Sequence, residues 1–282
     1  MEVYIPDLFD LNKIISSGQC FRAVARPDGT CRFVTGEQVL YIRKVSEENY
    51  EVSCGRDAWA SVWSPYFDLG RDYRTISAQI PRKDSFLSRA AQAGAGIRIL
   101  RQDPWETLVT FIISQRKSIP AIRWVVEMLS QRYGTPIRTS EETLYAFPTA
   151  RQLENVCEAD YITCKAGYRA PYLCDAVRQV LSGCLDLSGI SALSDCELIE
   201  ALKGVRGVGV KVANCVALFA YGRTACAPVD TWIKKIIQRE YRGRDPFGRY
   251  GPVAGIMQQY FFYYAQSHKG EPAHKKKEPE TA

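Results

Sequence analysis

Lys211 and Cys215 are the residues of this chain whose types and spacing most clearly suggest chemistry. They are four residues apart, so a helix would place both on one face, while Val212, Val216 and Phe219 form an apolar stripe on another. An amine that is partly withdrawn from water has a lowered pKa and can act as a nucleophile in Schiff-base chemistry. A lysine beside valines on a packed helix can equally extend its ammonium group to solvent. Both interpretations are open from these residues alone.

Asp230 follows this segment and is a second candidate for the same site. Apolar residues recur after it at Trp232, Ile233, Ile236 and Ile237, so its carboxylate is predicted to cap the helix that they form. A capping carboxylate is held rigidly, which leaves a second, catalytic role open.

Glycines at 204, 207 and 209 lie just before Lys211 and predict a tight connection between two helices. Ser194 and Glu197 form a capping box that begins the first of these helices, so the whole hairpin spans residues 194–221. Free backbone amides at such a tip, together with the helix dipole, can bind a phosphate group. Glycine used only for close packing explains the same spacing equally well.

The elements around this hairpin change character along the chain. Short β-branched and aromatic runs at 21–25, 32–35, 39–45 and 50–54 are separated by turn residues and predict antiparallel hairpins. From about Asp84 the apolar period becomes helical, and Asp103 with Pro104 predicts a capped helix start. Further helices are predicted near 120–133, 140–147, 150–157, 170–182, 195–202, 208–221, 231–242 and 252–266. The pattern indicates an α+β fold with a β-rich N-terminal part followed by a mostly helical part.

Composition excludes several classes of protein. No apolar stretch approaches the roughly 20 residues that a membrane span needs, and the N-terminus lacks the pattern of a signal peptide. We therefore expect a cytoplasmic protein with reduced cysteines. The ten cysteines form no C-x-x-C pair, and both histidines, His268 and His274, lie near the C-terminus, so neither zinc nor an iron–sulfur cluster is expected. The net charge of +6 suits a polyanionic partner but also an ordinary enzyme.

Several spaced motifs together resemble one family. The run 202–215 followed by Asp230 resembles the helix-hairpin-helix (HhH-GPD) superfamily of DNA glycosylases, and within it the 8-oxoguanine DNA glycosylases. The narrower resemblance also rests on the segments 17–22, 103–106 and 167–170 and on Gly255, Gln258 and Phe262. It covers roughly residues 8–266. It implies a TBP-like, antiparallel β-rich domain over 1–95 and a helical catalytic domain over 96–266. The charged tail at 267–282, which has no periodicity, is predicted to be disordered.

The resemblance implies a bifunctional glycosylase and abasic-site lyase that acts on double-stranded DNA containing a damaged base. Lys211 would attack C1′ of an extruded, oxidised purine nucleotide, and the resulting Schiff base would permit β-elimination of the abasic strand. Asp230 would stabilise the positive charge that develops at the sugar. No cofactor is implied. We expect a monomer that contacts no membrane and is associated with the nucleoid if the source is bacterial.

Further roles follow from the same resemblance. The backbone carbonyl of Gly18 would accept the N7 proton that 8-oxoguanine carries and guanine lacks. Cys215 and Phe262 would sandwich the flipped base, and Gln258 would meet its Watson–Crick edge. Three further pairs would contact the DNA. Tyr168 would fill the gap that the flipped base leaves in the stack, and Arg169 would contact the opposite base. Gly207 and Gly209 would bind phosphates, and Arg116 and Lys117 would contact the opposite base or phosphates.

The chain departs from the family where the opposite cytosine is usually read. Arg116, Lys117 and Ser118 replace an asparagine-rich turn, and Ala121 stands where the family often has an arginine. We therefore hypothesise that the preference for the base opposite the lesion is relaxed or differs from cytosine. Two alternative functions also remain at this point: a glycosylase of the same fold for alkylated or deaminated purines, and a non-catalytic DNA-binding module.

Overall fold

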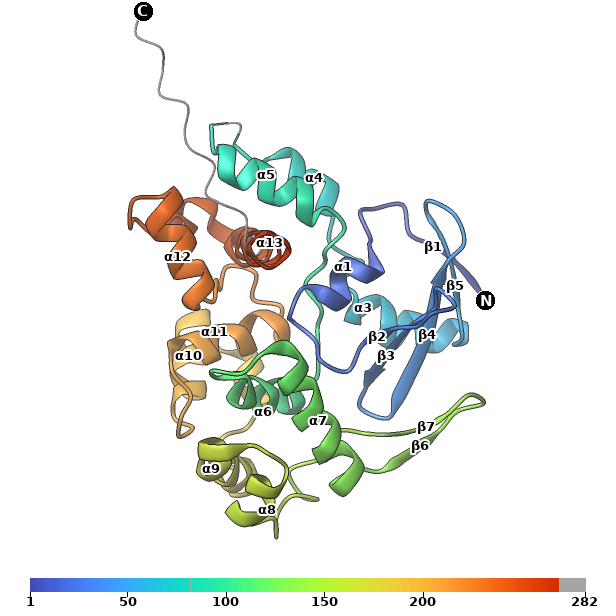
Figure 1. Ribbon diagram of the computed structural model, residues 1–282, viewed down its shortest axis with the longest axis vertical. Helices are drawn as coiled ribbons and strands as arrows, with labels where there is room; N and C mark the ends of the chain where they lie inside the picture. The colour runs from blue at the N-terminus through green and yellow to red at the C-terminus, as the bar shows by residue number, and fades with distance from the viewer. Residues whose placement is uncertain (82, 269–282) are drawn as a thin grey trace, which may run out of the picture.

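The computed structural model describes residues 1–81 and 83–268. An antiparallel sheet with short helices lies on one side of the molecule, and a larger assembly of helices lies on the other (Figure 1). This arrangement confirms the predicted α+β fold. The part of the predicted tail from residue 269 onward lies outside the described residues, whereas Ser267 belongs to the last helix.

The sheet has five strands, and every hydrogen-bonded neighbour is antiparallel. Its order is β1 (Glu2–Tyr4), β5 (Asn49–Val52), β4 (Gln38–Lys44), β3 (Cys31–Thr35) and β2 (Val24–Ala25). Strand β1 was not predicted because its three residues are too few to show a period.

The predicted strand at 21–25 is too long at its start. The Phe21 ring instead packs edge-on against Phe111 in the helical part, with the ring centres 6.0 Å apart. Arg22 donates to the carbonyl of Tyr145 and lies 3.7 Å from the carboxylate of Glu106. Burial raises the pKa of Glu106 to about 7. These contacts with distant residues draw the chain out of the sheet, so only its last two residues pair as β2.

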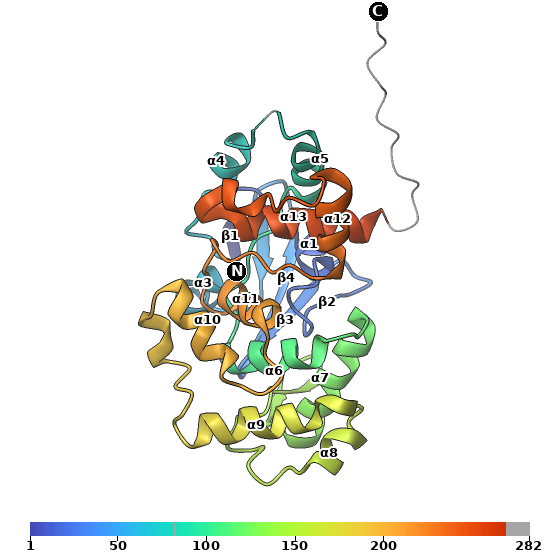
Figure 2. The same ribbon diagram turned by 90° about the vertical axis from the view of Figure 1, so that its left-hand side faces the viewer.

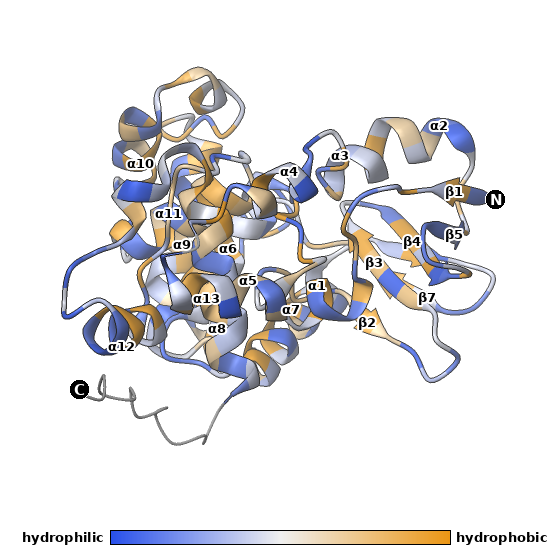
Figure 3. Cartoon of the chain, turned by 90° about the horizontal axis from the view of Figure 1, so that it is seen from above, coloured by the Kyte–Doolittle hydropathy of each residue, from blue (hydrophilic) through white to orange (hydrophobic). Residues whose placement is uncertain are grey.

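Aromatic side chains fill the space between the sheet and its helices. Helices α1 (Leu11–Ser16), α2 (Arg56–Ala58), η1 (Trp59–Trp63) and α3 (Ser64–Tyr66) lie beside the strands, whose centres are apolar (Figure 3). The ring of Phe67 contacts those of Phe9, Phe33 and Trp63, and all four rings are buried. The pairs of Phe67 with Phe9 and Phe33 are edge-to-face, a geometry that adds to the free energy gained from burial.

Helices α4 (Tyr73–Ala78) and α5 (Ser85–Gly94) leave the sheet, and α5 runs along α13 (Figures 1 and 2). A Cβ atom on Gly94 would lie 2.6 Å from the ring of Tyr260, so only glycine permits this close approach. Residues before 95 therefore contribute to both buried cores, and a domain boundary at residue 95 stays a prediction.

The helical part is built from eight α-helices and three 3₁₀ segments among the described residues. These are α6 (Pro104–Ser114), α7 (Ile119–Tyr133), α8 (Glu158–Thr163), η2 (Gly167–Arg169), α9 (Ala170–Leu181), η3 (Gly189–Ala192), α10 (Asp195–Lys203), α11 (Val210–Phe219), α12 (Thr231–Glu240), η4 (Phe247–Val253) and α13 (Ala254–Ser267). The predicted caps are confirmed at Asp103 and at the Ser194–Glu197 capping box. None of the described helices is both long and apolar enough to span a bilayer.

Two predicted helices are wrong. Residues 143–145 form the strand β7 (Thr143–Tyr145), which pairs with β6 (Pro136–Arg138). Glu141 and Glu142 at the tip of this hairpin form ion pairs with Arg26 and Arg32 of the sheet, and these tertiary contacts override the local helical pattern. Residues 150–155 form successive turns, and the α-helix in this region begins only at Glu158.

A fully buried guanidinium joins the segments around the sheet. Arg98 lies in the extended stretch between α5 and α6, and its side chain has 0 % of its surface exposed. Its five hydrogen bonds run to the carbonyl oxygens of Leu8, Phe67, Asp68 and Arg71, at 2.7–3.0 Å, and to the carboxylate of Asp7 at 2.9 Å. Every partner is far from Arg98 in sequence, so this side chain holds several loops together.

Replacing Arg98 by methionine tests this role. The substitution leaves buried carbonyl groups and Asp7 without their donor, so we expect the free energy of unfolding to fall by about 3–5 kcal/mol. Urea denaturation followed by circular dichroism measures the change. Arg151→Met removes an exposed ion pair with Glu154 and should change the same quantity by less than about 0.5 kcal/mol. Equal effects of the two substitutions would contradict the role of Arg98.

Candidate active site

A pocket of about 600 Å³ opens where the loop after α6, the helices α11 and α13, and the N-terminus of α12 meet the segment around Gly18. Eight of the residues predicted from the sequence line it: Gly18, Arg116, Lys117, Lys211, Cys215, Asp230, Gln258 and Phe262. They come from positions as far apart as 18 and 262, so the fold brings the predicted groups into one cavity.

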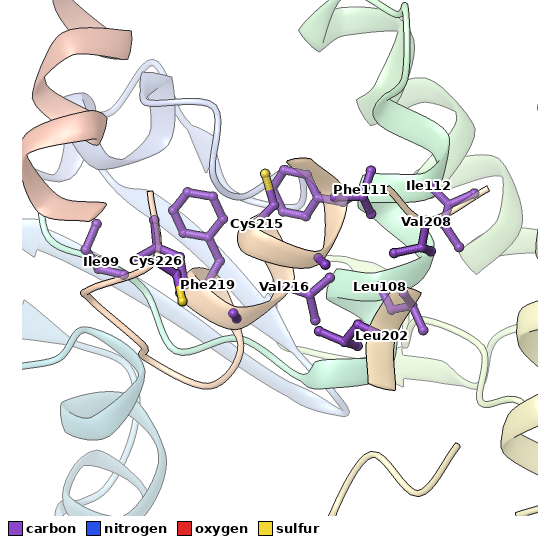
Figure 4. Close-up of a cluster of buried hydrophobic side chains, with 14 of the residues drawn as sticks. Ile99, Leu108, Phe111, Ile112, Leu202, Val208, Cys215, Val216, Phe219 and Cys226 are labelled. Carbon is purple, nitrogen blue, oxygen red and sulfur yellow. The ribbon is translucent and has the colours of Figure 1, made fainter. Parts of the chain in front are cut away.

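Lys211 and Cys215 lie in consecutive turns of α11, as their spacing predicts. The Nζ atom of Lys211 lies 5.1 Å from the ring centre of Phe111, which places the amine over an aromatic wall. Cys215 is buried beside the same ring (Figure 4). Burial raises the pKa of the Cys215 thiol, while the neighbouring Lys211 ammonium opposes that rise. The thiol is therefore a neutral wall of the pocket at ordinary pH.

Packing between α6 and α11 fixes the base of this wall. The rings of Phe111 and Phe219 stack at 5.5 Å, and Val216 and Leu108 fill the layer behind them (Figure 4). Helix α11 cannot rotate without breaking this contact. The direction in which Lys211 projects is consequently set by the buried core.

Asp230 caps α12, as predicted. Its Oδ1 atom accepts hydrogen bonds from the backbone amides of Trp232 and Ile233, both at 2.9 Å. The carboxylate is thereby held at the pocket wall, and the cap fixes its position relative to α11 and α13.

Gly18 occupies a position that only glycine fits. Its φ angle is +74°, and a Cβ atom there would lie 2.7 Å from Cε1 of Phe262. The backbone of the N-terminal segment therefore approaches the α13 side of the pocket directly.

Gln258 presents a buried polar group without a partner. The residue is 4 % exposed, and its Oε1 atom accepts no hydrogen bond from the residues that the structure describes. An amide oxygen left in this state costs about 1–3 kcal/mol. Because Gln258 lines the pocket, the oxygen is suited to accept hydrogen bonds from a ligand.

The loop between α6 and α7 connects the pocket to two neighbouring loops. Gln115 donates to the carbonyl of Gly207 at 3.1 Å, and Lys117 donates to the carbonyl of Lys165 at 2.9 Å. Arg116 between them has a φ angle of +52°. Burial and the charge of Arg169 lower the pKa of Lys117.

The remaining predicted DNA contacts lie on these neighbouring loops and do not line the pocket itself. Tyr168 is 52 % exposed, whereas Arg169 is only 4 % exposed and lies 4.3 Å from the centre of the Tyr168 ring. A Cβ atom on Gly207 would clash with the ring of Tyr172, so this glycine serves packing. Gly209 borders open space at the start of α11. The close-packing explanation therefore holds for Gly207, and phosphate binding at the hairpin stays a prediction.

Sequence reasoning missed the amides that hold the Gly18 segment. The side chain of Gln19 donates to the carbonyl of Arg98 at 2.8 Å and accepts from the amide of Leu100 at 2.8 Å. Gln102 donates to the carbonyl of Gln19, also at 2.8 Å. Gln19 belongs to a motif noted in the sequence, but nothing in its spacing showed that its amide bonds 79 to 81 residues away.

The model of the N-terminal domain of 8-oxoguanine DNA glycosylases matches residues 3–108. The structure of 8-oxoguanine glycosylase/lyase from Clostridium acetobutylicum in its apo form is similar over 93 % of this chain and 95 % of that one, with 38 % identity and a TM-score of 0.88. The chain belongs to the 8-oxoguanine DNA glycosylase family. The family predicted from the spaced motifs is therefore confirmed.

Two further comparisons are consistent with this family. The Clostridium enzyme in complex with double-stranded DNA containing cytosine opposite to 8-oxoG is similar over 95 % of this chain and 98 % of that one, with 35 % identity and a TM-score of 0.87. N-glycosylase/DNA lyase from Saccharomyces cerevisiae is 29 % identical over 262 residues, which are 82 % of this chain and 68 % of the yeast protein.

Gly18→Ala tests the fit of the N-terminal segment in this 8-oxoguanine DNA glycosylase. The left-handed backbone and the contact with Phe262 predict a loss of about 1–3 kcal/mol in the free energy of unfolding. Thermal denaturation measures it. Gly248→Ala is the matched control, because Gly248 has no atom within 4 Å of a Cβ and no left-handed φ, and it should be neutral or slightly stabilising. A Gly18→Ala protein as stable as wild type would exclude the tight fit.

Proposed function

We propose that this protein excises 8-oxoguanine from double-stranded DNA and then cleaves the abasic strand, with Lys211 as the nucleophile. The observation that carries the proposal is that the amine of Lys211 and the carboxylate of Asp230 line one pocket with Gly18 and Gln258. The pocket is open to the surface, and a base removed from the DNA stack would enter it.

The walls of the pocket suit a flat purine. Phe262 and Cys215 provide two apolar surfaces between which the base would be held. The unpaired Oε1 atom of Gln258 would accept a hydrogen bond from the Watson–Crick edge, where guanine bases carry N–H donors. The Gly18 carbonyl would accept a hydrogen bond from the N7–H group of 8-oxoguanine.

The chemistry that we propose begins with the unprotonated amine of Lys211. Its lone pair forms a bond to C1′ while the C1′–N9 bond breaks, and the departing base takes up a proton. Loss of a proton from the nitrogen and opening of the sugar ring give the Schiff base. Removal of a C2′ proton then expels the 3′ phosphate by cleavage of the C3′–O3′ bond, and water finally releases Lys211. The carboxylate of Asp230 would stabilise the positive charge on the sugar in the first step.

This mechanism needs no metal or organic cofactor, because the protein's own amine is the nucleophile. We expect a monomer to suffice and to act on DNA in the cytoplasm, at the nucleoid if the source is bacterial. The proposed DNA contacts outside the base itself are Tyr168, Arg169, Gly207, Gly209, Arg116 and Lys117, and the packing of Gly207 on Tyr172 holds the hairpin tip in place.

Borohydride trapping on a duplex containing 8-oxoguanine tests the proposal. Wild-type protein should form a covalent complex with the DNA, because borohydride reduces the Schiff base, and Lys211→Gln should form none. Lys234→Gln is the matched control, since Lys234 lines the same pocket from α12 and should leave trapping in place. A complex that persists with Lys211→Gln would rule out this nucleophile. Excision of an alkylated base without any trapped complex would favour the monofunctional alternative.

The loop after α6 generates a prediction about the opposite base. Because Arg116, Lys117 and Ala121 replace the residues that usually read cytosine, we expect excision rates opposite the four bases to agree within about tenfold, or about 1.4 kcal/mol. Single-turnover assays with four duplexes measure the rates. A preference for cytosine far above tenfold would contradict this expectation.

A further inference from the structure

Gln259 lies next to Gln258 on α13 and is bonded to the segment that carries Gly18. It is 2 % exposed, and its Nε2 atom donates a hydrogen bond to the carbonyl of Ser17 at 2.5 Å. The two residues are 242 positions apart in the sequence. Their bond ties the last helix to the peptide directly before Gly18.

The other side of Gly18 is held from a different direction. The amide of Gln19 donates to the carbonyl of Arg98 and to the hydroxyl of Ser17, at 2.8 and 2.9 Å. Gly18 therefore lies between an anchor on α13 and an anchor on the extended segment before α6. With φ at +74°, its own backbone needs such support because flanking contacts must select the left-handed conformation.

Three side chains of one helix now meet the recognition segment or the pocket. Gln258 offers its unpaired oxygen, Gln259 holds the Ser17 carbonyl, and Phe262 touches the α-carbon side of Gly18. An α-helix is stiff on this length scale, so the Gln259 bond links the position of the Gly18 peptide to that of the Gln258 oxygen on the same helix.

We propose that Gln259 is a positioning residue that fixes the Gly18 carbonyl and so sets the discrimination between 8-oxoguanine and guanine. This inference rests on the proposed function. The N7 atom of 8-oxoguanine donates a hydrogen bond, whereas N7 of guanine is an acceptor and would face the carbonyl lone pairs. This difference gives selectivity only if the carbonyl is held within about 0.5 Å of its place. A mobile carbonyl would move away from guanine and so remove the repulsion that rejects it, and it would also lose its hydrogen bond with 8-oxoguanine.

Gln259→Met keeps the volume of the side chain and removes its donor. We would measure dissociation constants of duplexes carrying 2′-fluoro analogues of 8-oxoguanosine or guanosine, whose glycosidic bonds resist cleavage, so that Lys211 stays intact. The ratio of the two constants should fall at least tenfold in the variant, through weaker binding of the oxidised base and unchanged or tighter binding of guanine. Ser130→Ala removes a buried hydroxyl of α7 outside the pocket and should preserve the wild-type ratio.

Gln259→Asn provides a second variant that keeps an amide but withdraws it by one methylene from Ser17, and it should lose discrimination in the same way. If both variants bind the two duplexes more weakly by the same factor, or keep the wild-type ratio of dissociation constants, the positioning role is wrong. If wild-type protein itself fails to distinguish the duplexes and forms no borohydride complex, the proposed function fails instead.

Discussion

A buried guanidinium must satisfy its hydrogen-bond donors inside the protein, and Arg98 does so with the loop before α1 and the loop after α3. The backbone carbonyl of the same residue accepts from Gln19, next to the glycine that enters the pocket. Arg98 therefore links the packing of the sheet part to the geometry of the pocket. The pocket requires this link because Gly18 comes from the N-terminal part, whereas Lys211, Asp230 and Gln258 come from helices.

The helical hairpin that carries Lys211 was predictable because its signals are local. The capping box of Ser194 and Glu197 and the cap at Asp230 act over three residues, and the face shared by Lys211 and Cys215 follows from helical spacing alone. Prediction failed where contacts with distant parts of the chain decide the secondary structure of a segment. Thr143–Tyr145 is a strand because the tip of its hairpin forms ion pairs with Arg26 and Arg32, and Phe21 leaves the sheet because it packs on Phe111.

The site shows the same division between local and distant signals. The residues of the site were predicted from motifs, and the structure gathers eight of them around one cavity. The residues that hold them could not be identified in that way. Gln259 and Gln102 are ordinary glutamines in the sequence, and only their bonds to Ser17 and Gln19 distinguish them from surface amides.

The hydrogen bond between Ser17 and Gln259 also has a consequence for biosynthesis. The first segment of the chain and the last helix are both walls of the pocket, although 242 residues separate them. A nascent chain on the ribosome can complete the sheet and the early helices, yet it has no base-binding pocket until α13 has emerged from the exit tunnel. Loop closure over such a separation is entropically costly, so we expect the pocket to form late in folding, together with the part of the helical core that α13 completes.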